Sequence, residues 1–407
     1  MFTAPYRVLY LNHTGMPGGA EFALSRMLGA FDLNKIKPIV VFGGDGHAVD
    51  LMKKNNVETH VIPLTREIRD MRKDTIGIKA LLNLKRAVSM AAYAAKIAIF
   101  ARHNKIQIIH TNTIKAHIYG ALAGCLAGLP VVWHVRDYVD ETYLPPTAVK
   151  IVRFLARYAP KHVIGVSKGV MEQLRMNDGG KHSTVVLDGL PDGELLGCAD
   201  YPEKCVTRTT TRIGIVGRLA RWKGQLIFLE AAAKISKSGY DAKFIIVGAA
   251  LFGEEAYEAE LRHQVNTLGL ETKVEFHGFA RDIPTELRNL DILVHASITG
   301  EPFGQVIVEG MAVGKPVIAT RGGGVPEIIT DGETGVLTDM GDADGLARQV
   351  IFLLQNPITA ARLGQAAFEH VRQKFKASFG ARKVESVYRS VLGERRMDYV
   401  EAGGELI

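Results

Sequence analysis

Cysteine is scarce in this sequence, and long apolar runs are missing from it. The three cysteines, Cys125, Cys198 and Cys205, stand far apart in 407 residues, and none belongs to a C-x-x-C pair. A disulfide framework, a zinc site or a thiol-redox site is therefore not expected, and a reducing, cytoplasmic setting fits best. Apolar runs stop short of the roughly 18 residues of a spanning helix, and the N-terminus lacks the long apolar core of a secretory signal.

Acidic residues are absent from a long stretch of the N-terminal half. Between Thr75 and Arg136 the chain has eight basic residues and no Asp or Glu. Residues 1–205 carry a net charge of +8, whereas residues 206–407 carry −1, within a total of +7. The N-terminal half should therefore meet something anionic.

Short apolar runs alternate with longer amphipathic ones, which is typical of parallel α/β sheets. In the first half we predict strands at residues 8–11, 39–42, 108–110, 131–134 and 162–166, and helices at 19–29 and 76–103. In the second half we predict strands at 212–216, 243–247, 274–276, 291–295 and 317–320, with helices at 225–236, 255–268, 304–313 and within 363–395. The two halves look like two copies of one architecture.

A polar, glycine-containing run near residues 189–211 separates these halves. The expected organisation is a Rossmann-like domain at 1–190, a linker at 191–211, a second Rossmann-like domain at 212–375, and a C-terminal helix and tail at 376–407.

The most informative motif is the stretch GEPFGQVIVEG at residues 300–310. It follows a predicted buried strand, and ligands of doubly wound sheets bind beyond the carboxyl ends of strands. The backbone N–H groups near Phe303, Gly304 and Gln305 would be first-turn donors aimed at an anion. Glu301 and Glu309 bracket the loop, and a carboxylate can accept hydrogen bonds from two vicinal hydroxyls of one sugar. The plain alternative is that both are surface helix acids.

A second motif, GIVGRLARWKG at residues 214–224, places Arg218 and Lys223 on a loop after a strand. A diphosphate leaving group gains negative charge as its bond breaks, so fixed cations stabilise that transition state more than the ground state. Arg binds oxygens bidentately and Lys acts as a point charge. The alternative is a pair of solvated loop cations.

Together these motifs resemble glycosyltransferase family 4, a family of retaining, metal-independent enzymes with the GT-B fold, in which two Rossmann-like domains face a cleft. The resemblance is strong over 212–340 and looser in the N-terminal half. It implies an acceptor domain at 1–190, a nucleotide-sugar donor domain at 212–375, and a last helix, at about 376–395, that crosses back to pack on the N-terminal domain. It implies that Arg218 and Lys223 bind the donor diphosphate, Glu301 the transferred sugar and Glu309 the nucleotide ribose. It also implies that the backbone around Phe303, Gly304 and Gln305 binds phosphate and sugar, and that the segment ending in Gly278 and Phe279 reads the base.

In the N-terminal half the resemblance concerns one loop and one strand end. The loop GMPGGAE, with Gly18 and Gly19, would lie over the donor diphosphate, and His134 would orient the donor sugar. Glu21 reads more readily as a helix acid favoured by the dipole. The alternative for His134 is a structural histidine at a strand end, with Asp137 as a second candidate carboxylate.

The predicted helix at 76–103 carries two patterns. At 100° per residue, Leu81, Leu84, Val88, Ala91, Ala95 and Ile99 share one face, and Lys79, Lys85, Arg86 and Lys96 share another arc. One interpretation is a core helix with a solvated basic face. The other is docking to anionic lipid headgroups or to a lipid diphosphate acceptor, which the missing acids favour.

The predicted activity is transfer of a sugar from a nucleotide sugar, with UDP favoured by family frequency, to a glycan or lipid-linked acceptor in polysaccharide or cell-envelope synthesis. No metal is expected, because Asp342–Ala343–Asp344 reads as a helix N-cap region and Arg218 and Lys223 can replace a metal. We expect no cofactor and no nucleic-acid partner. We do expect peripheral contact with the inner face of the cell membrane. The alternatives are a GT-B sugar-nucleotide epimerase and a non-catalytic sugar-nucleotide or membrane-binding protein.

Overall fold

The computed structural model describes residues 5–16, 18–69, 84–142, 144–180, 182–196, 210–251 and 253–393. Contacts divide the chain into two compact units. The N-terminal unit comprises Met1–Gly165, Leu174–Val186 and Ser378–Ile407, and the C-terminal unit comprises Val166–Gln173 and Leu187–Ala377. Most of the predicted linker, including Gly197, Cys198 and Cys205, lies outside the described residues, as does Lys79.

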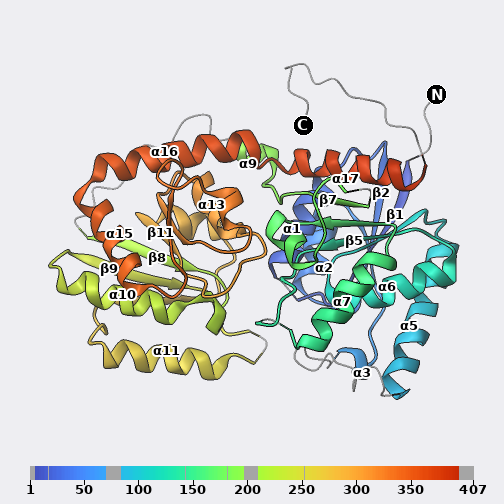
Figure 1. Ribbon diagram of the computed structural model, residues 1–407, viewed down its shortest axis with the longest axis horizontal. Helices are drawn as coiled ribbons and strands as arrows, with labels where there is room; N and C mark the ends of the chain where they lie inside the picture. Colours follow the sequence, from blue (N-terminus) through green and yellow to red (C-terminus); the bar gives the residue numbers. More distant parts are fainter. Residues whose placement is uncertain are drawn as a thin grey trace. The chain divides into compact units, whose positions relative to one another are not determined.

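The N-terminal unit is built on a seven-stranded parallel sheet in the order β3-β2-β1-β4-β5-β6-β7 (Figure 1). Its strands are β1 (Tyr6–Asn12), β2 (Ile36–Phe42), β3 (Glu58–Val61), β4 (Ile108–Thr111), β5 (Val131–Val135), β6 (His162–Gly165) and β7 (Ser183–Val185). Its helices are α1 (Gly19–Gly29), α2 (His47–Lys54), α3 (Arg66–Arg69), α5 (Leu84–His103), α6 (Ile114–Ala127) and α7 (Pro146–Tyr158). The order reverses direction between β1 and β4, which is where such sheets bind ligands.

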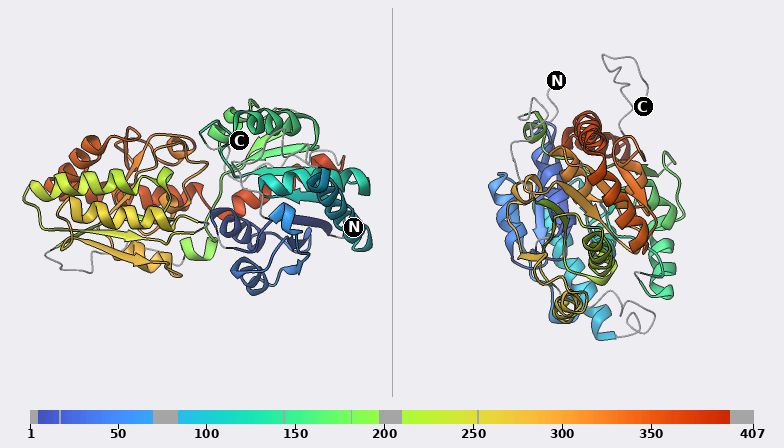
Figure 2. Two further views of the ribbon diagram at one scale, coloured as in Figure 1. Left: turned by 90° about the horizontal axis from the view of Figure 1, so that it is seen from below. Right: turned by 90° about the vertical axis from the view of Figure 1, so that its left-hand side faces the viewer.

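The C-terminal unit has a six-stranded parallel sheet in the order β10-β9-β8-β11-β12-β13. Its strands are β8 (Thr211–Val216), β9 (Ala242–Val247), β10 (Val274–Gly278), β11 (Ile292–His295), β12 (Val317–Thr320) and β13 (Val336–Thr338). Its helices are α8 (Lys168–Gln173), α9 (Asp192–Leu196), α10 (Gln225–Lys237), α11 (Glu255–Thr267), α12 (Ile283–Arg288), α13 (Gln305–Ala312), α14 (Val325–Ile328), α15 (Ala343–Gln355) and α16 (Pro357–Lys374). Figure 2 shows helices on both faces of this sheet.

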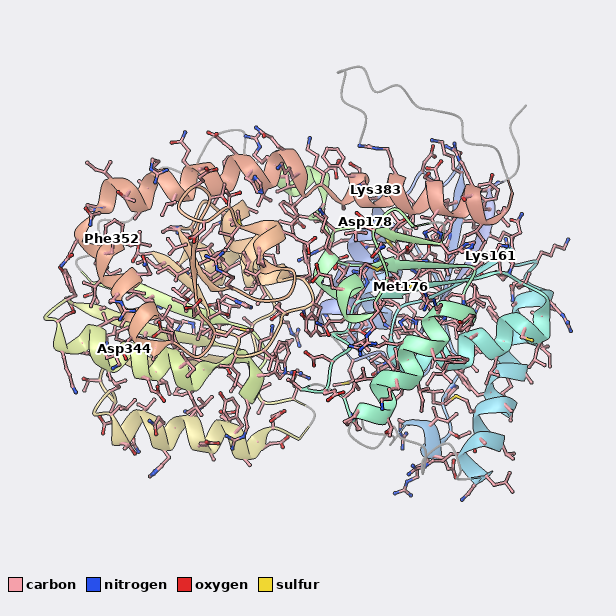
Figure 3. The ribbon with its side chains drawn as sticks, in the orientation of Figure 1. Lys161, Met176, Asp178, Asp344, Phe352 and Lys383 are labelled. Carbon is pink, nitrogen blue, oxygen red and sulfur yellow. The ribbon has the colours of Figure 1, made fainter. Side chains whose placement is uncertain are left out.

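Both sheets are apolar because their strands are covered on two faces, as parallel sheets require. In the C-terminal unit, Ile213, Phe244, Ile292 and Ile318 come from four neighbouring strands and join one buried cluster with α10. Asp342 caps α15 by accepting a hydrogen bond from Gly345 N at 2.8 Å, as its N-cap prediction requires. The neighbouring Asp344, labelled in Figure 3, instead pairs with Lys234 of α10 at 2.7 Å.

The last helix, α17 (Ala377–Val391), packs on the N-terminal unit although it follows the C-terminal unit in the chain. Its Ala381, Val384 and Tyr388 join the buried cluster formed by β1, β2 and β4. The Tyr388 hydroxyl lies 2.7 Å from the Tyr10 hydroxyl and 2.7 Å from His110 Nδ1.

Of the two interpretations of the long helix at 76–103, the core interpretation is wrong about which face is buried. Helix α5 buries Met90, Tyr93, Ala94, Ile97, Ala98 and Ala101, whereas Leu84, Val88 and Ile99, which that interpretation placed in the core, are exposed. The reason is that α5 has a second, alanine-rich apolar face, whose small side chains allow close packing against α6. Leu81 lies outside the described residues. Among the described residues, no helix is both long and apolar enough to cross a lipid bilayer.

Candidate active site

The loop after β8 carries the two predicted cations of the C-terminal unit. After Gly217 the chain makes a 3₁₀ turn at Arg221–Lys223 and ends it at Gly224, whose φ of 72° is left-handed. A Cβ at Gly224 would lie 1.9 Å from the carbonyl oxygen of Ala296, so only glycine permits this approach. Ile298 N donates to Trp222 O at 2.9 Å, which fastens this loop to the one that follows β11.

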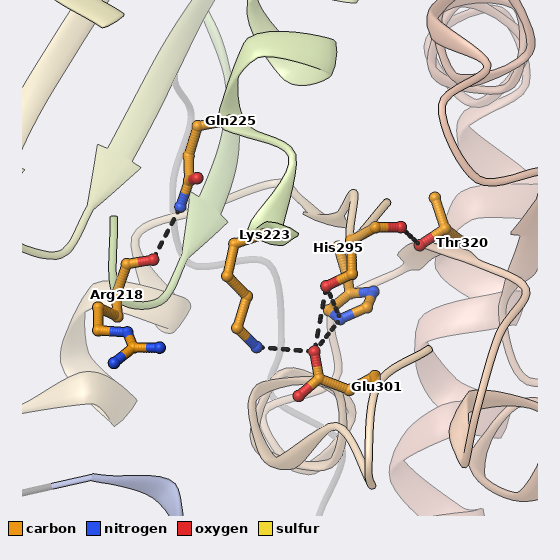
Figure 4. A network of polar contacts seen from close by, with 7 residues as sticks. Arg218, Lys223, Gln225, His295, Glu301 and Thr320 are labelled. Atoms are coloured by element: carbon orange, nitrogen blue, oxygen red, sulfur yellow. Dashed lines mark hydrogen bonds and ion pairs between the residues drawn. The ribbon is translucent and has the colours of Figure 1, made fainter. Parts of the chain in front are cut away.

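Lys223 and Glu301 meet directly, as Figure 4 shows. Lys223 Nζ lies 2.7 Å from Glu301 Oε2, and the two side chains are only 18% and 10% exposed. The same carboxylate oxygen lies 3.1 Å from His295 Nε2, at the end of β11. Ser297 Oγ donates to it at 3.1 Å. One oxygen of Glu301 is therefore surrounded by a cation and two polar side chains, and the other oxygen accepts none of these contacts.

The environment of Glu301 decides its charge. Burial raises the pKa of its carboxyl, but the charge of Lys223 and the hydrogen bond from His295 outweigh burial. The net pKa of Glu301 is well below its ordinary value, so the group is a carboxylate at neutral pH. A permanently ionised acceptor suits the binding of sugar hydroxyls.

The backbone of the Glu301 loop is fixed by the glycine turn that follows β12. Gly323 has a φ of 60°, and a Cβ there would lie 2.0 Å from Glu301 O. Gly324 N donates to the same carbonyl at 2.8 Å. From the other side, Ser167 Oγ donates to Pro302 O at 2.6 Å. A Cβ at Gly324 would lie 2.8 Å from Pro302 O, so the close approach of this turn to the Glu301 loop requires glycine at both 323 and 324.

Helix α13 begins at Gln305, immediately after the loop. Its N-cap, Gly304, has a φ of 120° and no side chain that could accept a hydrogen bond from the first-turn N–H groups. These backbone N–H groups therefore receive no side-chain cap from the N-cap residue. Phe303 is buried and packs against Phe375, with ring centroids 6.1 Å apart. Gln305 reaches Asp188 at 3.5 Å, and Glu309, one turn further along the helix, is half-buried.

The remaining predicted residues of this unit lie on separate loops at the same sheet edge. The Arg218 carbonyl accepts from Gln225 Nε2 at 3.0 Å, which orients that backbone, and the Arg218 side chain is half-buried (Figure 4). Gly278 ends β10 with a φ of 69° and accepts from Gly248 N at 2.8 Å. Phe279 follows it with 51% of its surface exposed. Of the predicted set, Lys223 and Glu301 are in direct contact.

In the N-terminal unit the glycine loop lies over a buried acid. Gly18 is the N-cap of α1 and Gly19 is its first residue. Glu21 is buried, and its Oε1 accepts from Asn12 Nδ2 at 2.9 Å. Burial raises the pKa of Glu21. A Cβ at Gly18 would lie 2.7 Å from Glu21 Oε2, so the Glu21 carboxyl group packs directly against the loop backbone at Gly18. Glu21 is also an acidic residue in the first turn of α1.

His134 is completely buried at the end of β5. Its ring meets the His110 ring edge-on, with centroids 5.3 Å apart, and its Nδ1 lies 3.4 Å from Arg136 Nη2. Burial, and then the charge of Arg136, hold the pKa of His134 well below its ordinary value, so the ring is neutral. Its Nε2 has no hydrogen-bond partner among the described residues. Contact between His134 and a donor sugar stays a prediction.

Sequence reasoning missed His295, Ser297 and Gln225. A lone histidine that ends an apolar strand gives no signal of its own, and the contact with Glu301 depends on the turn of the following loop. The signal that could have found these three residues is their place in the chain, because each lies next to or within a loop at the carboxyl end of β8 or β11. No group of three His, Cys, Asp or Glu side chains suited to a metal ion occurs among the described residues.

The two parallel sheets with helices on their faces define the GT-B class, and the predicted fold is confirmed. The family model for glycosyl transferases group 1 matches residues 206–370, and the model for glycosyltransferase family 4 matches residues 45–189. The chain belongs to glycosyltransferase family 4 and is a glycosyltransferase, as the motifs predicted.

Individual relatives cover most of the chain. It is 32% identical over 334 residues to the D-inositol 3-phosphate glycosyltransferase of Corynebacterium glutamicum, an alignment that covers 76% of this chain and 78% of that one. It is 20% identical over 361 residues to the capsular polysaccharide biosynthesis glycosyltransferase CapM of Staphylococcus aureus, covering 85% and 93%. The crystal structure of Anabaena HepE in complex with UDP and glucose aligns with a TM-score of 0.79 at 27% identity, covering 95% of this chain and all of that one.

Proposed function

We propose that this glycosyltransferase transfers a sugar from a nucleotide diphosphate sugar, with retention of configuration, to a glycan or lipid-linked acceptor. The observation that carries the proposal is the Lys223–Glu301 pair beside the start of α13. Lys223 and Arg218 would hold the diphosphate, Glu301 the transferred sugar and Glu309 the ribose. The amides near Phe303, Gly304 and Gln305 would take the phosphate oxygens.

The chemistry follows from where charge develops. The bond between the anomeric carbon and the phosphate oxygen breaks, and the acceptor oxygen bonds to that carbon from the same face. The acceptor's proton passes to the departing phosphate oxygen, so no protein base is required at this step. Lys223 and Arg218 offset the growing negative charge of the diphosphate, which is the role a metal plays elsewhere. Glu301 stabilises Lys223 in place before the donor arrives.

UDP is the favoured nucleotide. Structures of Anabaena HepE, 27–28% identical to this chain, are described in complex with UDP and with UDP-glucose. The segment ending at Gly278 and Phe279 would read the base. Relatives are named for inositol phosphate, capsular polysaccharide and lipopolysaccharide core as their substrates or products, which supports an acceptor used in cell-envelope glycan assembly. We also propose that Gly18, Gly19 and His134 of the N-terminal unit contact the donor. The basic surface of this unit would contact an anionic membrane.

The test is a hydrolysis screen across UDP-, GDP- and ADP-sugars, because slow donor hydrolysis needs no acceptor. Wild type should release one nucleoside diphosphate preferentially, and Glu301→Gln should lower the rate by about 100-fold. Glu369→Gln, which removes an exposed carboxylate on α16, is the matched control and should hydrolyse at the wild-type rate. Nucleotide release that is unaffected by Glu301→Gln would refute the assignment. Epimerised UDP-sugar in the absence of acceptor would favour the epimerase alternative.

A further inference from the structure

The outward face of α5 carries an unbroken apolar stripe. Leu84, Val88 and Ile99 are 76%, 59% and 67% exposed. At 100° per residue they lie within about 60° of one another, with Ala91 and Ala95 between them. The face opposite this stripe already packs against the unit, so the stripe is additional to the core. Apolar residues gathered in this way, unlike scattered ones, mark an interaction surface.

Helix α6 extends the stripe. Arg102, on the same face of α5, donates through Nη2 to the carbonyl oxygen of Leu126. Leu126 and Leu122 are both exposed on α6, one turn apart. The apolar surface therefore continues from one helix to the next where the two helices are joined.

Charge identifies the partner. Neither α5 nor α6 contains an Asp or Glu, and Lys85 and Lys96 lie about 100–120° round α5 from Leu84. Lys85 is paired with Glu67 at 3.1 Å, whereas Lys96 is exposed to solvent. A helix whose apolar stripe has basic side chains along one edge, and which contains no acid, matches a surface that is apolar inside and anionic outside.

Helix α7 repeats this pattern. It has no acidic residue, its Phe154 and Tyr158 are exposed one turn apart, and Lys150 is exposed near them. The successive right-handed crossovers β4-α6-β5-α7-β6 place α6 and α7 on one face of the sheet (Figure 1). Aromatic rings with a polar end favour the boundary between lipid and water.

We propose that the outer surface of α5, α6 and α7 is a lipid-docking face, whose apolar stripe enters the headgroup region of an anionic bilayer while the flanking lysines contact lipid phosphates. The proposal deepens the membrane contact proposed above by replacing a purely electrostatic approach with insertion of Leu84, Val88 and Ile99. It accounts for an exposed apolar face that one of the two interpretations of the sequence placed in the core. A second copy of the chain, the competing occupant, would have to bring the acids that this face lacks.

The experiment is co-sedimentation of the full chain with vesicles of phosphatidylglycerol and phosphatidylcholine, and with vesicles of phosphatidylcholine alone. Wild type should bind the anionic vesicles at least about tenfold more tightly. The variant Leu84→Gln/Val88→Gln/Ile99→Gln should lose about tenfold in binding at low and at high salt. Lys96→Gln/Lys150→Gln should lose binding chiefly at low salt, because its contribution is electrostatic.

The matched control is Leu33→Gln/Phe352→Gln/Ile358→Gln, which removes three exposed apolar side chains from other parts of the chain and should bind as wild type does. A second readout uses Cys125, which is exposed between Leu122 and Leu126. With Cys198 and Cys205 replaced by serine, an environment-sensitive fluorophore on Cys125 should brighten and shift to the blue on anionic vesicles.

Three outcomes would overturn the proposal. The first is wild-type binding by the triple stripe variant, and the second is equal binding to neutral vesicles. The third is no vesicle binding together with a dimer, seen by light scattering, that the stripe variant abolishes. Donor hydrolysis by the same variants without vesicles should be unchanged. If wild type bound vesicles but hydrolysed no nucleotide sugar, the proposed function would fail and the lipid-docking face would stand.

Discussion

Separating stability from activity at the Lys223–Glu301 pair is the sharpest test of the site. Removing one member of a buried ion pair leaves an uncompensated charge and typically costs about 3–5 kcal/mol. Here the cost should be at the lower end, about 3 kcal/mol, because 18% of the Lys223 side chain reaches solvent. Glu301→Gln and Lys223→Met should each destabilise the C-terminal unit by about this amount. The double variant should recover most of the loss, since neither charge remains.

The assay uses a reporter that the sequence supplies. The chain has two tryptophans, Trp133 in the N-terminal unit and Trp222 in the loop that carries Lys223. Lys223 Nζ lies 4.2 Å from the centre of the Trp222 ring, so in a Trp133→Phe background the fluorescence reports this loop. With a urea m-value of about 2 kcal/mol/M, each single variant should lower the midpoint by about 1.5 M, and the double variant by much less.

Activity should behave differently from stability. The double variant should fold well and still hydrolyse the donor far more slowly than wild type, because Arg218 alone remains to offset the charge of the diphosphate and the carboxylate for the sugar is gone. Low pH offers a second check. The folded pKa of Glu301 is depressed, so its stabilisation is complete above about pH 4.5 and is lost as the pH falls through the folded value. The gap between wild type and Glu301→Gln should narrow in acid. Single variants as stable as wild type, or a double variant whose losses simply add, would refute the reasoning.

Three further changes test other parts of the structure. Gly224→Ala should lower donor hydrolysis sharply and destabilise the C-terminal unit, because the new Cβ would lie 1.9 Å from Ala296 O. Gly239 is also left-handed but faces open space, so Gly239→Ala should lower the free energy of unfolding in urea by only about 1 kcal/mol. Tyr388→Phe should cost about 1–3 kcal/mol, because it leaves Tyr10 and His110 without their shared hydroxyl. That loss should appear in near-ultraviolet dichroism of the N-terminal unit and leave the Trp222 midpoint unchanged. Glu309→Ala should weaken binding of the nucleoside diphosphate by roughly tenfold in calorimetry, while the corresponding loss for Glu369→Ala should be nil.

Elements with strong periodicity could be predicted from the sequence, and weakly apolar ones could not. Helix α1 begins and ends where the pattern indicated, and the buried strands β4, β5 and β12 fall within a residue of their predicted limits. Strands β3, β7 and β13 were missed, because ETHV, STV and VLT are too short to show a period. These strands are recognised by the neighbour with which they pair, and pairing is not visible in a single sequence.

The face of a helix was harder to predict than its existence. Helix α5 has two apolar arcs, and the larger side chains of Leu84, Val88 and Ile99 made one of them fit a core interpretation as well as a docking interpretation. The arc that is buried contains Ala94, Ala98 and Ala101, whose value lies in allowing close approach. Side-chain size therefore pointed the wrong way, and only the packing against α6 decides which arc is inside.

The candidate site shows the same limit in its polar residues. The motifs placed Glu301 and Lys223 at one sheet edge, yet spacing could not reveal that their side chains touch, 78 residues apart in the chain. The contact requires two glycines, Gly224 and Gly323, that bring the loops of β8 and β12 against the loop of β11. Because both approaches exclude a Cβ, the geometry of the charged pair is set by backbone rather than by the charges themselves. A substitution at either glycine should therefore disturb the position of Glu301 as much as a substitution of Lys223 would, although neither glycine contacts the Glu301 carboxylate with a side chain.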